Sequence, residues 1–221
     1  MPLEVDHAFI ACALEAPEAD ALLRLGFVEG SSNSHPGQGT ANRRFFFENF
    51  MLELLWVADP AQARSERTRR TRLWDRWSYR DKGANPIGII FRSTDGQPAL
   101  GPFQTWAYTP SYLPAGASIH IAEGTTLDEP ELFYLPFLNR SAGRDSEPVA
   151  HALPIRRICG AAVGVRRLGE LSEASRRAQD HGLLAYFESP QPVLEIIFEG
   201  SPDTRIDLRP DLPVIFSGKT A

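Results

Sequence analysis

The stretch FFFENFMLELLWV at residues 45–57 decides the expected fold of this chain. Two apolar, aromatic-rich runs flank Glu48 and Asn49, which predict a two-residue hairpin turn because Asn tolerates a positive φ. The second run is apolar on both alternating faces, which is typical of a strand covered by a helix on one side and a core or cavity on the other. Glu53 is the one charged residue within that run. Because an unpaired buried carboxylate is costly, Glu53 needs a partner.

Before this hairpin, the pattern predicts a strand, a helix and a second short strand. The first strand alternates, with His7 on one face and Asp6 on the other. A helix follows, because Pro17 suits a first helical turn and Gly26 suits a helix end. The polar, glycine-rich residues 31–41 are expected to form a loop. The order is therefore β-α-β-β-β, with strands at 5–12, 27–29, 42–47 and 50–57 and a helix at 17–25.

Residues 59–85 are rich in arginine and are expected to form a connecting helix. Leu73, Trp74 and Trp77 would pack inward, and most of the arginines would lie in water. A phosphate-binding or nucleic-acid-binding role is the sharper alternative. The net charge of −5 favours the solvated face, since a general nucleic-acid binder is usually basic.

The rest of the chain repeats the strand pattern. Residues 94–103 are too broken by proline and glycine for a full helix, and residues 139–150 read as a polar linker. The sequence VLEIIF at 193–198 echoes MLELLW at 51–56, so we expect a βαβββ unit at both ends and a reduced version between them. The remaining elements are strands at 86–93, 104–112, 117–123, 131–138 and 158–165 and a helix at 171–181.

Composition and the distribution of apolar residues favour a cytoplasmic protein. With 221 residues the chain suffices for one large domain or two small ones. Its start has no leader pattern, and no apolar run approaches the length of a membrane span. Cys12 and Cys159 are expected to be buried, free thiols in a reducing compartment. We expect neither nucleic acid nor membrane as a partner; a homodimer is left open.

The opening strand VDHAFI at 5–10, the early helix ending in Gly-Phe and the strand LELL at 52–55 together resemble the vicinal oxygen chelate superfamily, and its glyoxalase-like branch in particular. The loop HPGQGTAN at 35–42 and the strand PIGIIFRS at 86–93 have counterparts there too. The resemblance implies an α+β fold in which repeated βαβββ modules form an open, mostly antiparallel, barrel-like sheet of the glyoxalase/bleomycin-resistance/dihydroxybiphenyl dioxygenase type. It covers residues 3–93 well and the C-terminal part at module level.

The implied organisation is a glyoxalase-like domain at 1–140 and an additional βαβββ module at 151–221, packed on the barrel or completing it. Within the domain we expect module one at 4–57, a helical linker at 58–85 and a reduced second module at 86–138. Which two modules pair to close the barrel is open.

Metal enzymes of the superfamily take a histidine from the first strand and a glutamate from the fourth strand of a module, and His7 and Glu53 stand at those positions. The resemblance therefore implies one divalent metal ion as a candidate cofactor. The partner module departs from the pattern, because Gly88 stands where its histidine is expected. Its glutamate position holds Glu131 or, in another register, Arg140. If the C-terminal module is the partner instead, these positions hold Gly160 and Glu195.

Two alternatives for the partner of Glu53 are open. Counting back from the hairpin turn places Arg44 directly across from Glu53, which offers a cross-strand ion pair without a metal. A metal site would need His7, Glu53 and at least one further donor, for which His120 is the best candidate.

Five residues are candidates for binding the substrate: Arg44, His35, Asn42, Trp106 and Tyr112. His35 and Asn42 flank a polar segment that either closes over a ligand or is tethered by its own hydrogen bonds. If it is a lid, residues 31–40 should be mobile without ligand. The aromatic residues of the strand at 104–112 line a pocket or pack in the core.

Two functions follow from this pattern. The first is a glyoxalase-like enzyme, an isomerase, lyase or dioxygenase acting on vicinal oxygens, with His7 and Glu53 as catalytic residues or metal ligands. The second is a metal-free binding or sequestering protein of the same fold, in which Arg44 holds a carboxylate of the ligand.

Overall fold

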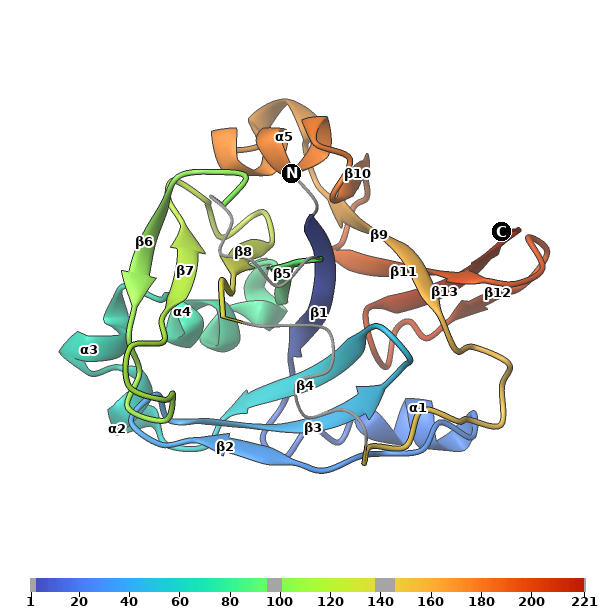
Figure 1. The fold of residues 1–221 in the computed structure, drawn as a ribbon, viewed down its shortest axis with the longest axis horizontal. Helices are drawn as coiled ribbons and strands as arrows, with labels where there is room; N and C mark the ends of the chain where they lie inside the picture. Colours follow the sequence, from blue (N-terminus) through green and yellow to red (C-terminus); the bar gives the residue numbers. More distant parts are fainter. Residues whose placement is uncertain (1–2, 95–100, 138–145, 221) are drawn as a thin grey trace.

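The computed structural model describes residues 3–94, 101–137 and 146–220. Eight strands form one curled sheet in the order β2-β3-β4-β1-β5-β8-β7-β6 (Figure 1). The first four are β1 (Leu3–Ala11), β2 (Asn33–His35), β3 (Thr40–Phe46) and β4 (Met51–Val57). The other four are β5 (Ile87–Ser93), β6 (Thr105–Tyr108), β7 (Ile119–Ala122) and β8 (Glu131–Tyr134).

The sheet consists of two halves with the same strand pairing. In the first half β1 runs parallel to β4 and β4 runs antiparallel to β3; in the second half β5 and β8 are parallel and β8 and β7 are antiparallel. An antiparallel pairing of β1 with β5 joins the halves. The expected barrel-like sheet of repeated modules is confirmed, and the middle module is the one that pairs with module one.

The first module departs from expectation at its second strand. Helix α1 (Ala19–Arg24) follows β1 as predicted, but the strand expected at 27–29 is absent from the described elements. The short β2 lies instead at Asn33–His35, inside the predicted loop, because its backbone pairs with β3 at the sheet edge.

The hairpin turn is confirmed, but the reason given for Asn49 was wrong. Phe46 pairs with Met51, and the Phe47 amide donates to the Phe50 carbonyl oxygen at 2.8 Å. Among the described residues other than glycine, a positive φ occurs at Glu15, Ala16 and Arg72, and not at Asn49. The Asn49 side chain instead donates to the Ile158 carbonyl oxygen at 2.7 Å and accepts from its amide at 2.9 Å, so the residue anchors the turn to the C-terminal part.

The arginine-rich connection is a series of short helices rather than one helix. Thr68 and Thr71 donate their hydroxyl protons to backbone carbonyl oxygens, and Arg72 has a φ of 56°, so each helical turn ends early. Leu73 is buried as expected, and most of the arginines are exposed or half-buried, with Arg76 as an exception at 1% exposed. The elements are α2 (Pro60–Ala63), α3 (Glu66–Arg69), α4 (Leu73–Ser78) and the 3-10 helix η1 (Arg80–Lys82).

The C-terminal residues form a separate five-stranded sheet in the order β10-β9-β11-β13-β12. The strand that follows helix α5 pairs parallel with β9, the first strand of this part, whereas β2 of module one pairs antiparallel with β3. The strand order therefore differs from that of module one. The elements are β9 (Ile158–Val165), the 3-10 helix η2 (Leu168–Glu170), α5 (Glu173–Asp180), β10 (Ala185–Glu188), β11 (Val193–Glu199), β12 (Arg205–Asp207) and β13 (Val214–Lys219).

Other expectations concern single residues and connections. Cys12 is buried as expected, but Cys159 is exposed, because it lies on the outer face of β9 with its thiol near the Ile197 carbonyl oxygen. Parts of the segments predicted at 94–103 and 139–150 lie outside the described residues, as does Arg140. No helix in the described ranges is long and apolar enough to span a membrane.

His151 lies in the core that joins the two sheets. Its Nδ1 accepts the Val28 amide at 3.0 Å and its Nε2 donates to the Phe46 carbonyl oxygen at 2.9 Å, with the ring packed against Phe27. This arrangement requires a neutral imidazole. Burial lowers the pKa of His151 from its ordinary value, in spite of the opposing hydrogen bond to Phe46.

The folded protein should therefore lose stability as the pH falls. Because the pKa of His151 is lower in the folded state, the unfolded chain binds the proton more readily, and stability should fall as the pH drops below about 6.5, the ordinary pKa of histidine. Urea unfolding between about pH 7.5 and pH 5 measures this, and His151→Gln should make the profile less steep, with His35, whose pKa is also lowered by burial, contributing to the slope that is left. His181→Gln, at the exposed end of α5, is the matched control and should leave it unchanged. A profile that is equally steep in His151→Gln would contradict the assignment.

Candidate functional site

The concave face of the eight-stranded sheet lines an open cavity of about 410 Å³. Because strand side chains alternate between faces, every second residue of each strand points into it. Six of the sequence-predicted site residues line this cavity: His7, His35, Asn42, Arg44, Glu53 and Tyr112.

A β-bulge in β1 brings Asp6 into the cavity beside His7. Val5 pairs with Phe91 and His7 with Ile90, so Asp6 has no partner residue on β5. The prediction that Asp6 and His7 face opposite sides assumed a regular strand and was wrong. An extra residue re-aims the side chains that follow it, and such bulges are frequent beside active sites.

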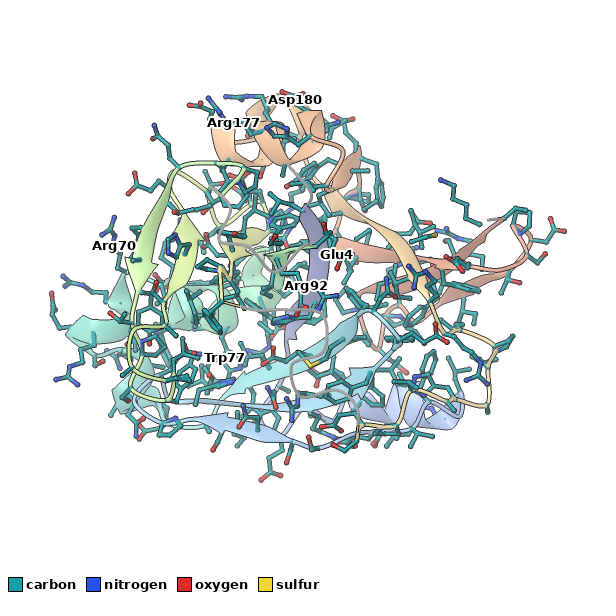
Figure 2. All side chains as sticks on the ribbon, viewed as in Figure 1. Glu4, Arg70, Trp77, Arg92, Arg177 and Asp180 are labelled. Atoms are coloured by element: carbon teal, nitrogen blue, oxygen red, sulfur yellow. The ribbon has the colours of Figure 1, made fainter. Side chains whose placement is uncertain are left out.

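His7 stands between two carboxylates. Its Nδ1 lies 2.6 Å from Asp6 Oδ2, and its Nε2 lies 3.9 Å from Glu53 Oε2. Because a carboxylate only accepts, Nδ1 carries the proton and Nε2 faces the cavity and Glu53. Arg92 holds Asp6 from behind through an ion pair of 2.6 Å and also binds Glu4; Figure 2 labels Arg92 and Glu4 close together beside β1.

Asn42, rather than Arg44, is the hydrogen-bond partner of Glu53. Arg44 does pair with Glu53 in the strand register, as the sequence predicts. Its guanidinium, however, reaches the edge of the sheet, where it donates to the Ser31 carbonyl oxygen at 2.6 Å. Asn42 Nδ2 donates to Glu53 Oε1 at 2.6 Å, and its Oδ1 accepts the Asn33 amide at 2.7 Å. The strand register thus places the Arg44 backbone opposite Glu53, but the long Arg44 side chain extends to a different partner, Ser31.

The polar loop is tethered across the cavity mouth. His35 Nδ1 and Gln38 Nε2 contact the Thr40 hydroxyl at 2.9 and 2.8 Å, and the Tyr112 hydroxyl donates to Gln38 at 2.9 Å. The His35 and Tyr112 rings lie 4.9 Å apart. Burial lowers the pKa of His35 and raises the pKa of Tyr112 well above its ordinary value, so both are uncharged at neutral pH. Ligand-dependent mobility of this loop stays a prediction.

Two sequence-predicted residues, His120 and Trp106, do not line the cavity. His120 lies between Ile119 and Ile121, which do line it, so alternation along β7 turns His120 to the other face. Its Nδ1 lies 3.2 Å from the Thr105 hydroxyl. Trp106 packs against the apolar residues of the cavity wall and is covered by the Arg70 guanidinium at 4.3 Å, the residue labelled at the outer edge in Figure 2.

The cavity residues do not fit the implied metal ion. His7 Nε2 and Glu53 Oε2 provide two donors on one wall, but catalytic metals generally have about three protein ligands. Across the described ranges, no group of three or more His, Cys, Asp or Glu side chains could hold an ion. Glu131, the loose match for a second glutamate, is 2% exposed and forms an ion pair with Arg76 at 3.1 Å.

The absence of the histidine expected at position 88 of the partner module has a steric explanation. Gly88 pairs with Phe9, and a Cβ atom at Gly88 would lie 2.1 Å from the Phe9 ring. The glycine therefore makes room for an aromatic side chain of the cavity wall, and a histidine cannot stand there without displacing it.

Gly88→Ala should consequently destabilise the protein. Overpacking a tightly packed core typically costs about 1–3 kcal/mol, and urea unfolding measures the loss. Gly160→Ala is the matched control in β9, because its Cβ would meet Ile197 at an ordinary 3.5 Å and should change stability little. If Gly88→Ala were as stable as Gly160→Ala, Phe9 would not be the reason for the glycine.

The cavity is divided between the two modules. Its polar side chains come mostly from module one, and Thr71, Tyr108 and Tyr112 are the exceptions. Its apolar wall is a buried cluster drawn mainly from module two, to which Phe9, Leu55 and Leu73 are added. The module-two members of this wall are Ile90, Tyr108, Ile119, Ile121, Phe133 and Leu135. Sequence patterning gave no signal for most of these residues, since cavity-lining and core residues have the same composition.

The fold and the cavity define a protein in which two modules with the same strand pairing form one curled sheet around a cavity. A family model described as a glyoxalase-like domain matches residues 5–177, and the chain belongs to that family. No curated protein matches the sequence.

Solved structures with a similar fold differ strongly in sequence. A hypothetical protein from Staphylococcus aureus superposes with a TM-score of 0.54 and 10% identity, covering 99% of this chain and 100% of that one. A mutant of 4-hydroxymandelate synthase from Streptomyces coelicolor has a TM-score of 0.46 and 16% identity, covering 98% of this chain and 62% of that one. The likeness to the Staphylococcus protein shows a shared fold.

Proposed function

We propose that this chain is an enzyme that moves a proton on a small oxygenated molecule, with His7 as the acid–base residue. The observation that carries the proposal is the placement of His7 between Asp6 and Glu53 at 2.6 and 3.9 Å on the lining of the cavity. Asp6 positions the ring through Nδ1, and Glu53 lies where it can stabilise the imidazolium that forms when Nε2 accepts a proton.

The chemistry that suits this arrangement is proton abstraction next to a carbonyl group. His7 Nε2 would take a proton from the carbon beside the carbonyl; the electron pair of that C–H bond forms a C=C bond and the carbonyl π pair moves to oxygen, giving an enediolate. Return of the proton to the former carbonyl carbon, with transfer of the hydroxyl proton to the enediolate oxygen, completes an isomerisation. In a lyase reaction the electron pair instead re-forms the carbonyl and expels a leaving group, protonated by the His7 imidazolium, from the carbon β to it, so that a C=C bond remains there. The dioxygenase alternative would depend on a metal ion, and we derive no step through one because the donors do not fit.

Deuterium exchange tests this proposal without knowledge of the natural substrate. Hydroxyacetone, 3-hydroxybutan-2-one and 2-hydroxy-1-phenylethanone have vicinal oxygens and apolar groups of increasing size. In D₂O the protein should accelerate exchange of their protons next to the carbonyl, and His7→Ala should slow this roughly 100- to 10,000-fold. His181→Ala is the control for a histidine outside the cavity. Exchange that is absent for all three compounds, or that persists in His7→Ala, would contradict the proposal.

Chelator should have no effect on this protein. The donor set predicts that thermal melts of the wild type, His7→Ala and Glu53→Gln each coincide with and without EDTA. Protein purified without added metal should contain substoichiometric metal by elemental analysis. A wild-type melting temperature that falls with chelator, together with insensitive His7→Ala and Glu53→Gln variants, would instead establish a metal held by those two residues.

A metal-free binding protein is the second candidate. It is favoured by the extent to which the polar wall is already hydrogen-bonded, through Asn42 to Glu53 and through Gln38 to Thr40 and Tyr112. Such preorganisation favours affinity as well as catalysis. Ligand binding without deuterium exchange would support this candidate. Cytoplasmic location and homodimer formation stay predictions from the sequence.

A further inference from the structure

The charged groups around the cavity indicate the chemical class of its ligand. Two carboxylates, Asp6 and Glu53, line the polar wall. Arg44 is the one lysine or arginine among the described lining residues. Whether the cavity accepts an anion therefore depends on whether the charge of Arg44 is available.

The charge of Arg44 is already balanced at the sheet edge. Its Nε donates to the Ser31 carbonyl oxygen at 2.6 Å, its Nη2 donates to the Ser31 hydroxyl at 2.5 Å, and Nη2 lies 3.8 Å from Glu147 Oε1. Ser31 in turn donates its amide to Glu147 at 2.9 Å. Although burial opposes the shift, hydrogen bonds from Ser31 and the charge of Arg44 lower the pKa of Glu147, so its carboxylate is ionised at neutral pH. A ligand carboxylate would have to compete with Glu147 for this arginine.

The charge of Asp6 is also balanced, because Arg92 lies behind it at 2.6 Å. Glu53 differs, since its Oε1 accepts from the neutral Asn42 side chain and its Oε2 lies 3.9 Å from His7, beyond hydrogen-bond distance. Within the described part of the chain, the structure gives no hydrogen bond to Oε2. This oxygen is thus a carboxyl acceptor on the cavity lining that can receive a hydrogen bond from a ligand.

The apolar part of the lining determines the rest of the ligand. Phe9, Phe133, Leu135 and Ile121 belong to one buried apolar cluster, and the Phe9 and Phe133 rings lie 5.7 Å apart. A wall of this kind favours an alkyl or aromatic group by removing its surface from water. Most of the polar side chains come from module one and most of this cluster comes from module two, so a ligand that satisfies both carries its polar group at one end.

From this division we infer that the cavity takes an amphiphile with an uncharged or cationic hydrogen-bond-donating head and an apolar body, and that it excludes carboxylates. The head donates to Glu53 Oε2, and the body lies against the module-two wall. The inference rests on the proposed function because both concern the same cavity. It predicts which ligands bind there, and it does not require that the protein transfers a proton.

Three probes of equal size test the inference: 3-phenylpropan-1-ol, 3-phenylpropylamine and 3-phenylpropionate. Titrations followed by protein NMR at neutral pH should show that the amine and the alcohol each bind about tenfold or more tightly than the carboxylate, the effect of one charge-assisted hydrogen bond. Butylamine, which lacks the ring, should bind more weakly than 3-phenylpropylamine. The comparison uses the wild-type protein and does not depend on a variant that folds.

Variants then locate the selectivity. Glu53→Gln should reduce the preference for the amine over the carboxylate about tenfold. Glu195→Gln makes the same substitution at the corresponding position of β11, outside the cavity, and should retain the preference. Equal or tighter binding of 3-phenylpropionate, or binding of none of the probes at millimolar concentration, would overturn the inference. Loss of carboxylate binding in Arg44→Gln would assign the site to anions and also overturn it. Deuterium exchange by the wild type would in either case leave the proposed function standing.

Discussion

Arg76→Met is expected to lower the free energy of unfolding by roughly 3–5 kcal/mol, the usual cost of removing one partner from a buried ion pair. Arg76 and Glu131 have side chains that are 1% and 2% exposed, and their charged groups lie 3.1 Å apart. The Arg76 guanidinium also donates to the carbonyl oxygens of Asn85 and Glu129 at 2.5 and 2.8 Å. Burial lowers the pKa of Arg76 and the charge of Glu131 opposes this, so the ion pair is what keeps a buried cation tolerable.

Urea unfolding of a matched set isolates this effect. Arg69→Met removes an arginine from an exposed pair with Glu66 in the same connection, and should change stability by less than about 1 kcal/mol. Adding Glu131→Leu to Arg76→Met should recover part of the loss, because the unpaired buried carboxylate is then gone. A single Arg76→Met variant as stable as Arg69→Met would show that the buried pair does not hold α4 to the sheet.

Asp6→Ala should lower stability by roughly 2–4 kcal/mol and also release the ring of His7. Arg92, which is 1% exposed, forms ion pairs with Asp6 and Glu4. Of these two carboxylates, the variant leaves Glu4. It also removes the acceptor that holds His7 Nδ1, so the imidazole can change its tautomer and orientation.

Two measurements separate the structural effect from the positioning effect. Urea unfolding gives the stability, and ¹⁵N NMR of the imidazole gives the tautomer of His7, which should carry its proton on Nδ1 in the wild type and lose that preference in Asp6→Ala. Asp207→Ala is the control, since Asp207 pairs with Arg209 at an exposed site and should affect neither quantity. An unchanged His7 tautomer in Asp6→Ala would show that Asp6 stabilises the bulge but does not position the ring.

The sequence predicts the hairpin, its register and the class of fold well. Alternating apolar runs around Glu48 and Asn49 depend on local strand and turn preferences, which act within about ten residues. For this reason the position of Arg44 opposite Glu53 could be counted from the turn. The partners of the Arg44 side chain could not be predicted in this way. Ser31 lies in a loop that closes onto the sheet, and Glu147 lies more than 100 residues away in the sequence.

The same limit applies to the residues that sequence reasoning missed or misplaced. Asp6 enters the cavity because one strand bulges against another, and a regular alternation contains no sign of this. His120 was a plausible metal donor by residue type, yet the register of β7 turns it away from the cavity. Buried Arg76 looks like its solvated neighbours in sequence, since only the distant Glu131 distinguishes it.

What the sequence by itself determined is the class of fold, the hairpin with its register, and the presence of a polar strand position at Glu53 within an apolar run. What only the tertiary structure decided is the pairing of module one with the middle module, the partner of Glu53 and the two-sided character of the cavity. The physical reason is the range of the forces involved. Strand and turn preferences are local, whereas hydrogen-bond partners, ion pairs and cavity walls are formed between segments that meet only when the sheet curls and closes.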